Sequence, residues 1–123
     1  MAAASPRTLK FSRGMRIKQG RDFSRVRREG QRRVAGCVIA NWQTLPVGTA
    51  ARLGVVTSGR IGNAVVRNRA RRLLREVFRL HQHDLTAPVD LVLIARASIA
   101  GKGFLEVERD VLSALGRSAL LKQ

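Results

Sequence analysis

The sequence has few acidic residues. Eight Asp and Glu stand against 24 Lys and Arg, which gives a formal net charge of +16 over 123 residues. Because this charge far exceeds what solubility requires, we expect a polyanionic partner, either a nucleic acid or an anionic membrane surface. The chain also has a single cysteine, Cys37, so it cannot form an internal disulfide. A lone cysteine in an apolar run is typical of a small buried residue in a protein from a reducing compartment.

Long apolar runs are also absent. No segment approaches the 18 or so apolar residues of a transmembrane helix, and the N-terminus lacks the apolar stretch of a signal peptide. We therefore predict a cytoplasmic protein with no membrane partner. The 45% of hydrophobic residues suits one domain with a core of modest size. We predict a flexible basic arm over residues 1–15 and a single domain over residues 16–123.

Patterns that would carry catalysis or hold a metal are missing as well. The sequence shows no Ser-His-Asp arrangement, no well-placed pair of carboxylates and no phosphate-binding glycine loop. His81 and His83 lie two positions apart, so on a helix they would point to different faces, and no cluster of Cys or acids accompanies them. We therefore predict a binding protein with no catalytic residue and no metal ligand of its own.

The most distinctive segment is a basic amphipathic helix, predicted from Ala64 to Gln82 or His83 with Asn63 as its N-cap. Its apolar stripe comprises Val66, Ala70, Leu73 and Val77, with Leu74 and Leu80 close by. The opposite face presents Asn68, Arg71, Arg72, Arg75 and Arg79, and Arg67 and Arg69 lie on the flanks. Glu76 is the one acid in this helix, so like charges repel one another at i,i+4 spacing.

This unbalanced basic face predicts binding of a polyanion. A merely solvated face is the weaker interpretation, because solvated helices usually mix both signs of charge. The chain has 20 Arg and four Lys, and a guanidinium can grip phosphate with two N–H groups and stack on bases, although a GC-rich genome would also favour Arg. In the last helix the charges nearly cancel. We therefore place the binding surface in the first two-thirds of the chain.

The other periodicities predict an α+β fold. A helix is expected over residues 20–29, ended by Gly30, and another from Phe104 to about Leu115. Strands are expected over residues 36–43, 52–58 and 89–97, with a weak signal around Arg33 and Val34. The strands 36–43 and 52–58 are expected to form an antiparallel hairpin, with Trp42 covering a sheet edge. The order α-β-β-(β)-α-β-α predicts a sandwich in which helices cover one sheet.

Residues 58–76, SGRIGNAVVRNRARRLLRE, closely resemble the signature of the bacterial ribonuclease P protein family, whose pattern has an RNR core. Residues 17–30, with the pair Asp22 and Phe23, resemble the first helix of the family, and residues 89–97 resemble its last strand. The resemblance covers roughly residues 16–115. It implies the fold of the second domain of ribosomal protein S5, with a left-handed βαβ crossover that general handedness rules would not predict.

The resemblance also implies a function. The family is the protein subunit of ribonuclease P, an endoribonuclease that removes the 5′ leader of precursor tRNA, and hydrolysis is carried out by the RNA subunit with Mg²⁺. We accordingly expect the RNA subunit and precursor tRNA as partners, one protein per RNA subunit, Mg²⁺ held mainly by the RNA, and no DNA. The residues expected to contact the RNA subunit are Arg67, Asn68, Arg69, Arg71, Arg72 and Arg75.

A second set of residues is expected to hold the leader, namely Phe23, Arg27, Arg60, Val38 and Ala40. A core role for Phe23 is about as well supported by the sequence as base stacking. Two positions depart from the family pattern. Arg27 stands where many relatives have a second aromatic, which predicts weaker discrimination among leader bases, and Gly59 stands where the family usually has lysine.

Two other classes of protein share some of these features. A ribosomal protein or general RNA chaperone would share the charge and the α+β fold, but it would have no reason to carry the RNR signature. A DNA-binding protein could insert the arginine helix into the major groove, yet such readers usually expose Asn, Gln and Ser among the cations. Preference for leader-bearing tRNA, and competition between duplex DNA and structured RNA, would separate these alternatives.

Overall fold

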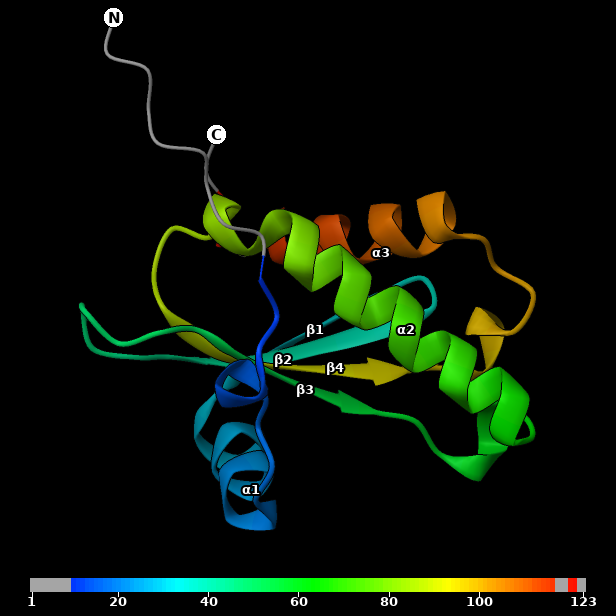
Figure 1. Ribbon diagram of the computed structural model, residues 1–123, viewed down its shortest axis with the longest axis horizontal. Coiled ribbons are helices and arrows are strands. Elements are labelled where there is room, and N and C mark those ends of the chain that lie inside the picture. The colour runs from blue at the N-terminus through cyan, green and yellow to red at the C-terminus, as the bar shows by residue number, and fades with distance from the viewer. Residues whose placement is uncertain (1–9, 117–119, 122–123) are drawn as a thin grey trace, which may run out of the picture.

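The computed structural model describes residues 10–116 and 120–121. Its elements are α1 (Gly20–Glu29), β1 (Gln31–Ala35), β2 (Val38–Thr44), β3 (Arg52–Val56), α2 (Ala64–His81), β4 (Val89–Ala95) and α3 (Phe104–Gly116). Figure 1 shows three layers, with α2 and α3 on one face of the sheet and α1 on the other. The predicted α+β sandwich is confirmed. Among the described residues, no helix has the length and apolar character that a membrane span requires.

The four strands are arranged in the order β1-β2-β4-β3. β1 and β2 are antiparallel, as are β2 and β4, whereas β3 and β4 are parallel. The predicted hairpin between residues 36–43 and 52–58 is therefore wrong, because β4 lies between these two strands. β4 is buried along almost its whole length and so takes a central place, and the hairpin partner of β2 is β1, where the sequence signal was weak.

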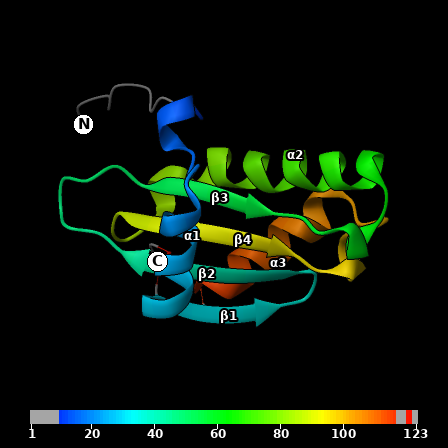
Figure 2. The same cartoon turned by 90° about the horizontal axis from the view of Figure 1, so that it is seen from below.

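The β3–α2–β4 crossover is left-handed, as the family resemblance implies. In Figure 2 both strands run from left to right with β3 above β4. The same view is taken from below, so α2 lies behind the sheet. Parallel βαβ units are nearly always right-handed, so this connection is a specific mark of the fold.

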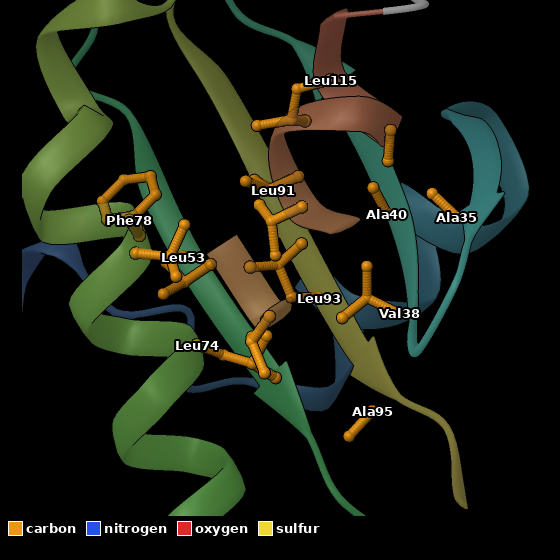
Figure 3. Close-up of a cluster of buried hydrophobic side chains, with 14 of the residues drawn as sticks. Ala35, Val38, Ala40, Leu53, Leu74, Phe78, Leu91, Leu93, Ala95 and Leu115 are labelled. Atoms are coloured by element: carbon orange, nitrogen blue, oxygen red, sulfur yellow. The ribbon is translucent and has the colours of Figure 1, made fainter. Parts of the chain in front are cut away.

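Helix α2 begins at its predicted cap, because the Asn63 side chain accepts a hydrogen bond from the Val66 N–H at 3.1 Å. The residues of α2 that are buried in the core are Ala70, Leu74, Val77 and Phe78. Phe78 is absent from the predicted stripe. These side chains pack on residues of the sheet that include Leu53, Leu91 and Leu93 (Figure 3). This core holds α2 with its arginines directed away from the sheet.

Helix α1 lies on the other face of the sheet over a much smaller apolar cluster. Ile17, Val26 and Val92 are its buried members, and Phe23 and Ile94 pack against them while remaining partly exposed. Val26 is the one residue of α1 that is buried. The helix therefore covers only part of this face, and Figure 2 shows no helix over the remainder of the same face.

The segment before α1 is packed against the domain. The Phe11 ring meets the Phe78 ring edge-on with 5.7 Å between centroids, and the Arg16 guanidinium lies over the Phe11 ring at 5.0 Å. Arg16 also pairs with Leu53 as a short parallel bridge beside β3. Phe11 and Arg16 thus contact the domain, and the flexible basic arm over residues 1–15 stays a prediction. Residues 1–9 lie outside the part of the chain that the structure describes.

Candidate nucleic-acid interface

The arginine face of α2 carries positive charge that no acid of the described chain balances. Among the residues that the structure describes, no salt bridge reaches Arg67, Arg69, Arg71, Arg72 or Arg75. Arg79 differs, because its Nε and Nη2 donate to the two carboxylate oxygens of Glu76 at 2.7 and 2.8 Å. The one acid of this helix thus neutralises the arginine at its C-terminal end and leaves the others available.

Two of these arginines form hydrogen bonds that leave their charge intact. Arg71 donates to the Asn68 side-chain oxygen at 2.7 Å, and Arg67 donates to the Gly62 carbonyl at 3.1 Å. Burial lowers the pKa of Arg75, and the neighbouring charges of Arg16 and Arg71 lower it further. The face is therefore a row of oriented, mutually repelling guanidinium groups, and a polyanion would relieve the repulsion.

A separate cleft lies on the opposite face of the sheet, beside α1. Residues from α1 and all four strands line it: Phe23, Ser24, Arg27, Arg32, Ile39, Asn41, Val56, Val92 and Ile94. Its floor is mostly aliphatic and its rim carries Arg27 and Arg32, both exposed. An aromatic ring, an apolar floor and cations at the edge are the features that proteins use to hold single-stranded nucleic acid.

Phe23 connects α1 to the floor of this cleft. Its ring lies so close to Gly54 on β3 that a Cβ added at Gly54 would stand 2.5 Å from the ring carbon Cε1. The ring packs against the Ile17–Val26–Val92 cluster and also lines the cleft. The two roles left open by the sequence are therefore compatible in one side chain, which anchors α1 and presents a face to a bound base.

Comparison with known proteins identifies the family. A family model described as Ribonuclease P matches residues 11–119. The ribonuclease P protein component of Brevibacillus brevis is 34% identical over 112 residues, covering 90% of this chain and 88% of that protein. This chain belongs to the ribonuclease P protein family. It is thus a protein subunit of a ribonucleoprotein that takes part in tRNA processing.

Solved structures of the family agree with the fold. The ribonuclease P protein of Staphylococcus aureus superposes with a TM-score of 0.79 at 26% identity, covering 88% of this chain and 98% of that one. The protein from Thermotoga maritima superposes with a TM-score of 0.73 at 27% identity, covering 83% and 96%. Membership of the ribonuclease P family therefore extends over the sheet, α1 and α2, which carry the two surfaces described above.

Two of the predicted leader-binding residues do not face the cleft. Val38 and Ala40 are fully buried in the core on the other face of the sheet, and Figure 3 shows them in the same layer as Leu91 and Leu93. The prediction is wrong for both. Successive residues of a strand point to opposite faces, so the cleft is lined by Ile39 and Asn41 instead.

The other candidates are at the surface. Arg27 is exposed on the rim of the cleft, and Arg60 is exposed in the short turn Gly59–Ile61 that leads into α2. β3 ends at the cleft with Val56, and the chain then passes through this turn to the start of the arginine face. The turn thus connects the strand that borders the cleft to the helix that carries the arginine face, although the two surfaces lie on opposite sides of the sheet.

An interaction that the sequence analysis missed lies beneath α1. Asp90 on β4 is fully buried, and its carboxylate accepts hydrogen bonds from Arg52 at 2.8 and 2.7 Å and from Arg25 of α1 at 2.6 Å. Burial alone would raise the pKa of Asp90, but the hydrogen bonds from the two arginines outweigh it and hold the pKa below 3.8. The sequence does mark Asp90 as unusual, because it is the one charged residue inside the apolar run 89–95.

The described residues contain no group of three or more His, Cys, Asp or Glu that could hold a metal ion. His81 instead lies between two acids, with ring nitrogens 2.9 Å from Asp84 and 2.8 Å from Glu108. Burial lowers its pKa, but the two carboxylates outweigh this and the net pKa is raised. His81 therefore links the end of α2 to α3 rather than acting as an unengaged surface residue.

Proposed function

We propose that this protein uses its two surfaces to hold the two RNAs of ribonuclease P. The exposed face of α2 binds the RNA subunit, and the cleft beside α1 binds the single-stranded 5′ leader of precursor tRNA. The observation that carries the proposal is the presence, on one small domain, of an unneutralised arginine face on one side of the sheet and a separate aromatic cleft on the other.

The α2 face suits a folded RNA better than a short strand. Its guanidinium groups lie along a rigid helix, so they can meet phosphates that are themselves fixed in space. The residues we assign to this contact are Arg67, Asn68, Arg69, Arg71, Arg72 and Arg75. Arg79 contributes less, because Glu76 already binds its guanidinium.

The cleft suits unpaired nucleotides. Phe23 offers a ring for stacking, the apolar floor accepts a base, and Arg27 and Arg32 stand where backbone phosphates would pass. Arg60 lies between the cleft and α2 and would contact the RNA where leader and RNA subunit meet. Because base-edge readout requires fixed polar groups and this floor is mostly aliphatic, we expect weak discrimination among leader bases.

The chemical step would belong to the RNA subunit. Mg²⁺ bound there supplies an activated water and stabilises charge on the phosphodiester undergoing hydrolysis. The protein's part is electrostatic and geometric. Its cations lower the repulsion between two polyanions and so reduce the Mg²⁺ concentration that the reaction needs. One protein per RNA subunit and a cytoplasmic location also stay predictions.

The decisive experiment is processing of a precursor tRNA by the RNA subunit at limiting Mg²⁺, with and without this protein. We expect strong stimulation by the wild-type protein, and a loss of stimulation when Arg69 and Arg72 are changed together to Gln. The matched control is Arg79→Gln, which removes an arginine already bound to Glu76. Absence of any stimulation by the wild-type protein would reject the proposal.

A general RNA chaperone is the alternative that charge alone allows. It would bind mature tRNA and leader-bearing precursor equally, because its contacts would be with phosphates common to both. The holoenzyme should instead bind the precursor more tightly, and Phe23→Ala should remove most of that preference. Equal affinity of the wild-type holoenzyme for both RNAs would favour the chaperone.

A further inference from the structure

The most unusual buried group of the molecule is the carboxylate of Asp90. Its side chain has no exposed surface, yet it lies on a strand whose other residues are apolar. It is held from two directions, by Arg52 from the neighbouring strand β3 and by Arg25 from α1. The side chain of Arg25 also donates to Gln43 on β2 and contacts Asp22 at 3.3 Å. One helix and three strands thus meet at a single buried charge.

Helix α1 depends on this contact because its apolar attachment is small. Val26 is its one buried residue, and Phe23 is only half buried. A short helix held at a central apolar point can roll about its own axis. Arg25 precedes Val26 by one residue, so its side chain leaves the helix on one flank of that point and ties it to β4.

The cleft residues of α1 lie away from this tie. Phe23 and Arg27 are four residues apart and therefore share one side of the helix, whereas Arg25 is about 200° from each of them. A roll of α1 that loosens Arg25 would consequently change the height of Phe23 and Arg27 above the sheet. At the end of α1, the Asn41 side chain donates to the carbonyls of Val26 and Gln31 at 3.2 and 2.7 Å and fixes the axial position.

We propose that Asp90 is a positioning residue for the leader: through Arg25 and Arg52 it sets the orientation of α1 and thereby the shape of the cleft. Asp90 does not contact RNA itself, because it is buried beneath α1. The inference rests on the proposed function of the cleft. It adds that leader affinity depends on a buried ion cluster, while affinity for the RNA subunit, bound on the other side of the sheet, does not.

The test compares Asp90→Asn with the wild-type protein in the assembled holoenzyme. We would measure the affinity for leader-bearing precursor and for mature tRNA, and separately the affinity of the protein for the RNA subunit. Asp90→Asn should lower the ratio of the first two affinities by roughly tenfold. It should leave binding of the RNA subunit within about twofold, because α2 is held by a different core. Hydrogen exchange should quicken in α1 and not in α2.

Asp110→Asn is the matched control. Asp110 is also a buried carboxylate, but it lies on α3 and accepts the Cys37 N–H at 2.9 Å, away from α1. Its loss should destabilise the protein without changing the leader preference. Arg25→Lys, which keeps a cation near Asp90, should retain more of the preference than Arg25→Met. If Asp90→Asn does not fold, Arg25→Met gives the same comparison with Asp90 still paired to Arg52.

The outcomes separate the two proposals. An unchanged leader preference in Asp90→Asn, or in Arg25→Met, would overturn the positioning role while leaving the function of the cleft in place. An equal loss in Asp110→Asn would also overturn it, because the effect would then follow stability alone. A wild-type holoenzyme without any leader preference would reject the proposed function itself, and the inference with it.

Discussion

Arginines occur in two contrasting settings in this protein. On the exposed face of α2, five arginines lie close together without an acid to pair with among the described residues. Beneath α1, Arg25 and Arg52 share the buried carboxylate of Asp90. Arginine therefore has two roles in this protein. The paired arginines beneath α1 hold the domain together, whereas the unpaired arginines of α2 are available to a partner outside the molecule.

The difference follows from the environment of each group. A buried charge must be compensated inside the protein, because water cannot solvate it there. An exposed charge is solvated already, so it can remain unpaired until a polyanion arrives and releases counterions. The position of the few acids thus separates structural from binding arginines more clearly than the arginines themselves do.

The largest effect is expected when the buried carboxylate that pairs Arg25 and Arg52 is removed. Asp90→Ala removes the carboxylate that both guanidinium groups share and leaves them only the longer contacts with Asp22, so we expect a loss of about 3–5 kcal/mol in the free energy of unfolding, measured in urea. Because its pKa is depressed in the folded protein, Asp90 stabilises the fold above the unfolded pKa near 3.8, and this contribution disappears as the pH falls through the folded pKa. Stability of Asp90→Ala should therefore depend less on pH in that acid range. A loss below about 1 kcal/mol, the value of a surface pair, would contradict the prediction.

Gly54→Ala tests the apolar half of the attachment of α1. The new Cβ would overlap the Phe23 ring, so either the ring or α1 must shift. We expect a loss of about 1–3 kcal/mol in the free energy of unfolding, together with weaker leader binding. Gly14→Ala is the control, because nothing lies within 4 Å of a Cβ added there. Wild-type leader affinity in Gly54→Ala would show that the position of the ring does not matter.

Arg72→Gln and Arg79→Gln compare an unpaired arginine with a paired one on the same helix. Arg72 is exposed and has no acidic partner among the described residues, whereas Glu76 binds Arg79. If Arg72 makes one phosphate contact, its loss should weaken RNA-subunit binding and reduce the slope of log K against log salt by about 0.7–0.9. Arg79→Gln should change the slope less. Equal changes would mean that internal pairing does not decide which arginines bind RNA.

A smaller effect is expected on the stability of the isolated protein. Burial lowers the pKa of Arg75, and the nearby charges of Arg16 and Arg71 lower it further. Arg75→Gln should therefore raise the free energy of unfolding by about 0.2–0.5 kcal/mol at low salt, and the gain should shrink as salt is added. Thermal unfolding at two ionic strengths measures this. A loss of stability at both would show that the side chain packs more than it repels.

The smallest effect concerns His81, a cation paired at the far end of α2. Its pKa is raised in the folded protein, so its contribution is fully present below the unfolded value of 6.5 and is lost as the pH rises through the folded pKa. His81→Gln should remove this slope near neutral pH, which denaturation at a series of pH values would detect. Cys37, whose pKa burial raises to about 11, should not contribute a slope there. An unchanged pH profile in His81→Gln would assign the slope to other groups.

Features set by neighbouring residues could be predicted from the sequence. The bounds of α1 and the start of α2 at Asn63 follow from glycine positions, a capping side chain and helical periodicity, all of which act over a few residues. The arginine face follows from the same periodicity. The resemblance over residues 58–76 predicted the family, and comparison confirmed it.

The pairing of the strands, and the side of the sheet to which each strand residue points, could not be predicted from neighbouring residues. β2 and β3 are close in sequence but are separated by β4, whose partners lie far along the chain. Val38 and Ala40 were assigned to the wrong face because residues 36–43 show no clear alternation, and a shift of one residue reverses every side chain of a strand. Asp90 gave no sign of its two partners, which are 65 and 38 residues away.

By itself, then, the chain's order of residues determined the helices, the basic face of α2 and the family. Only the tertiary structure decided which arginines remain free, which side of the sheet forms the cleft, and that the orientation of α1 depends on a buried aspartate. The physical reason is the distance along the chain over which each property acts. Helix formation and charge density are local properties, whereas burial and ion pairing depend on which distant segments the folded core brings together.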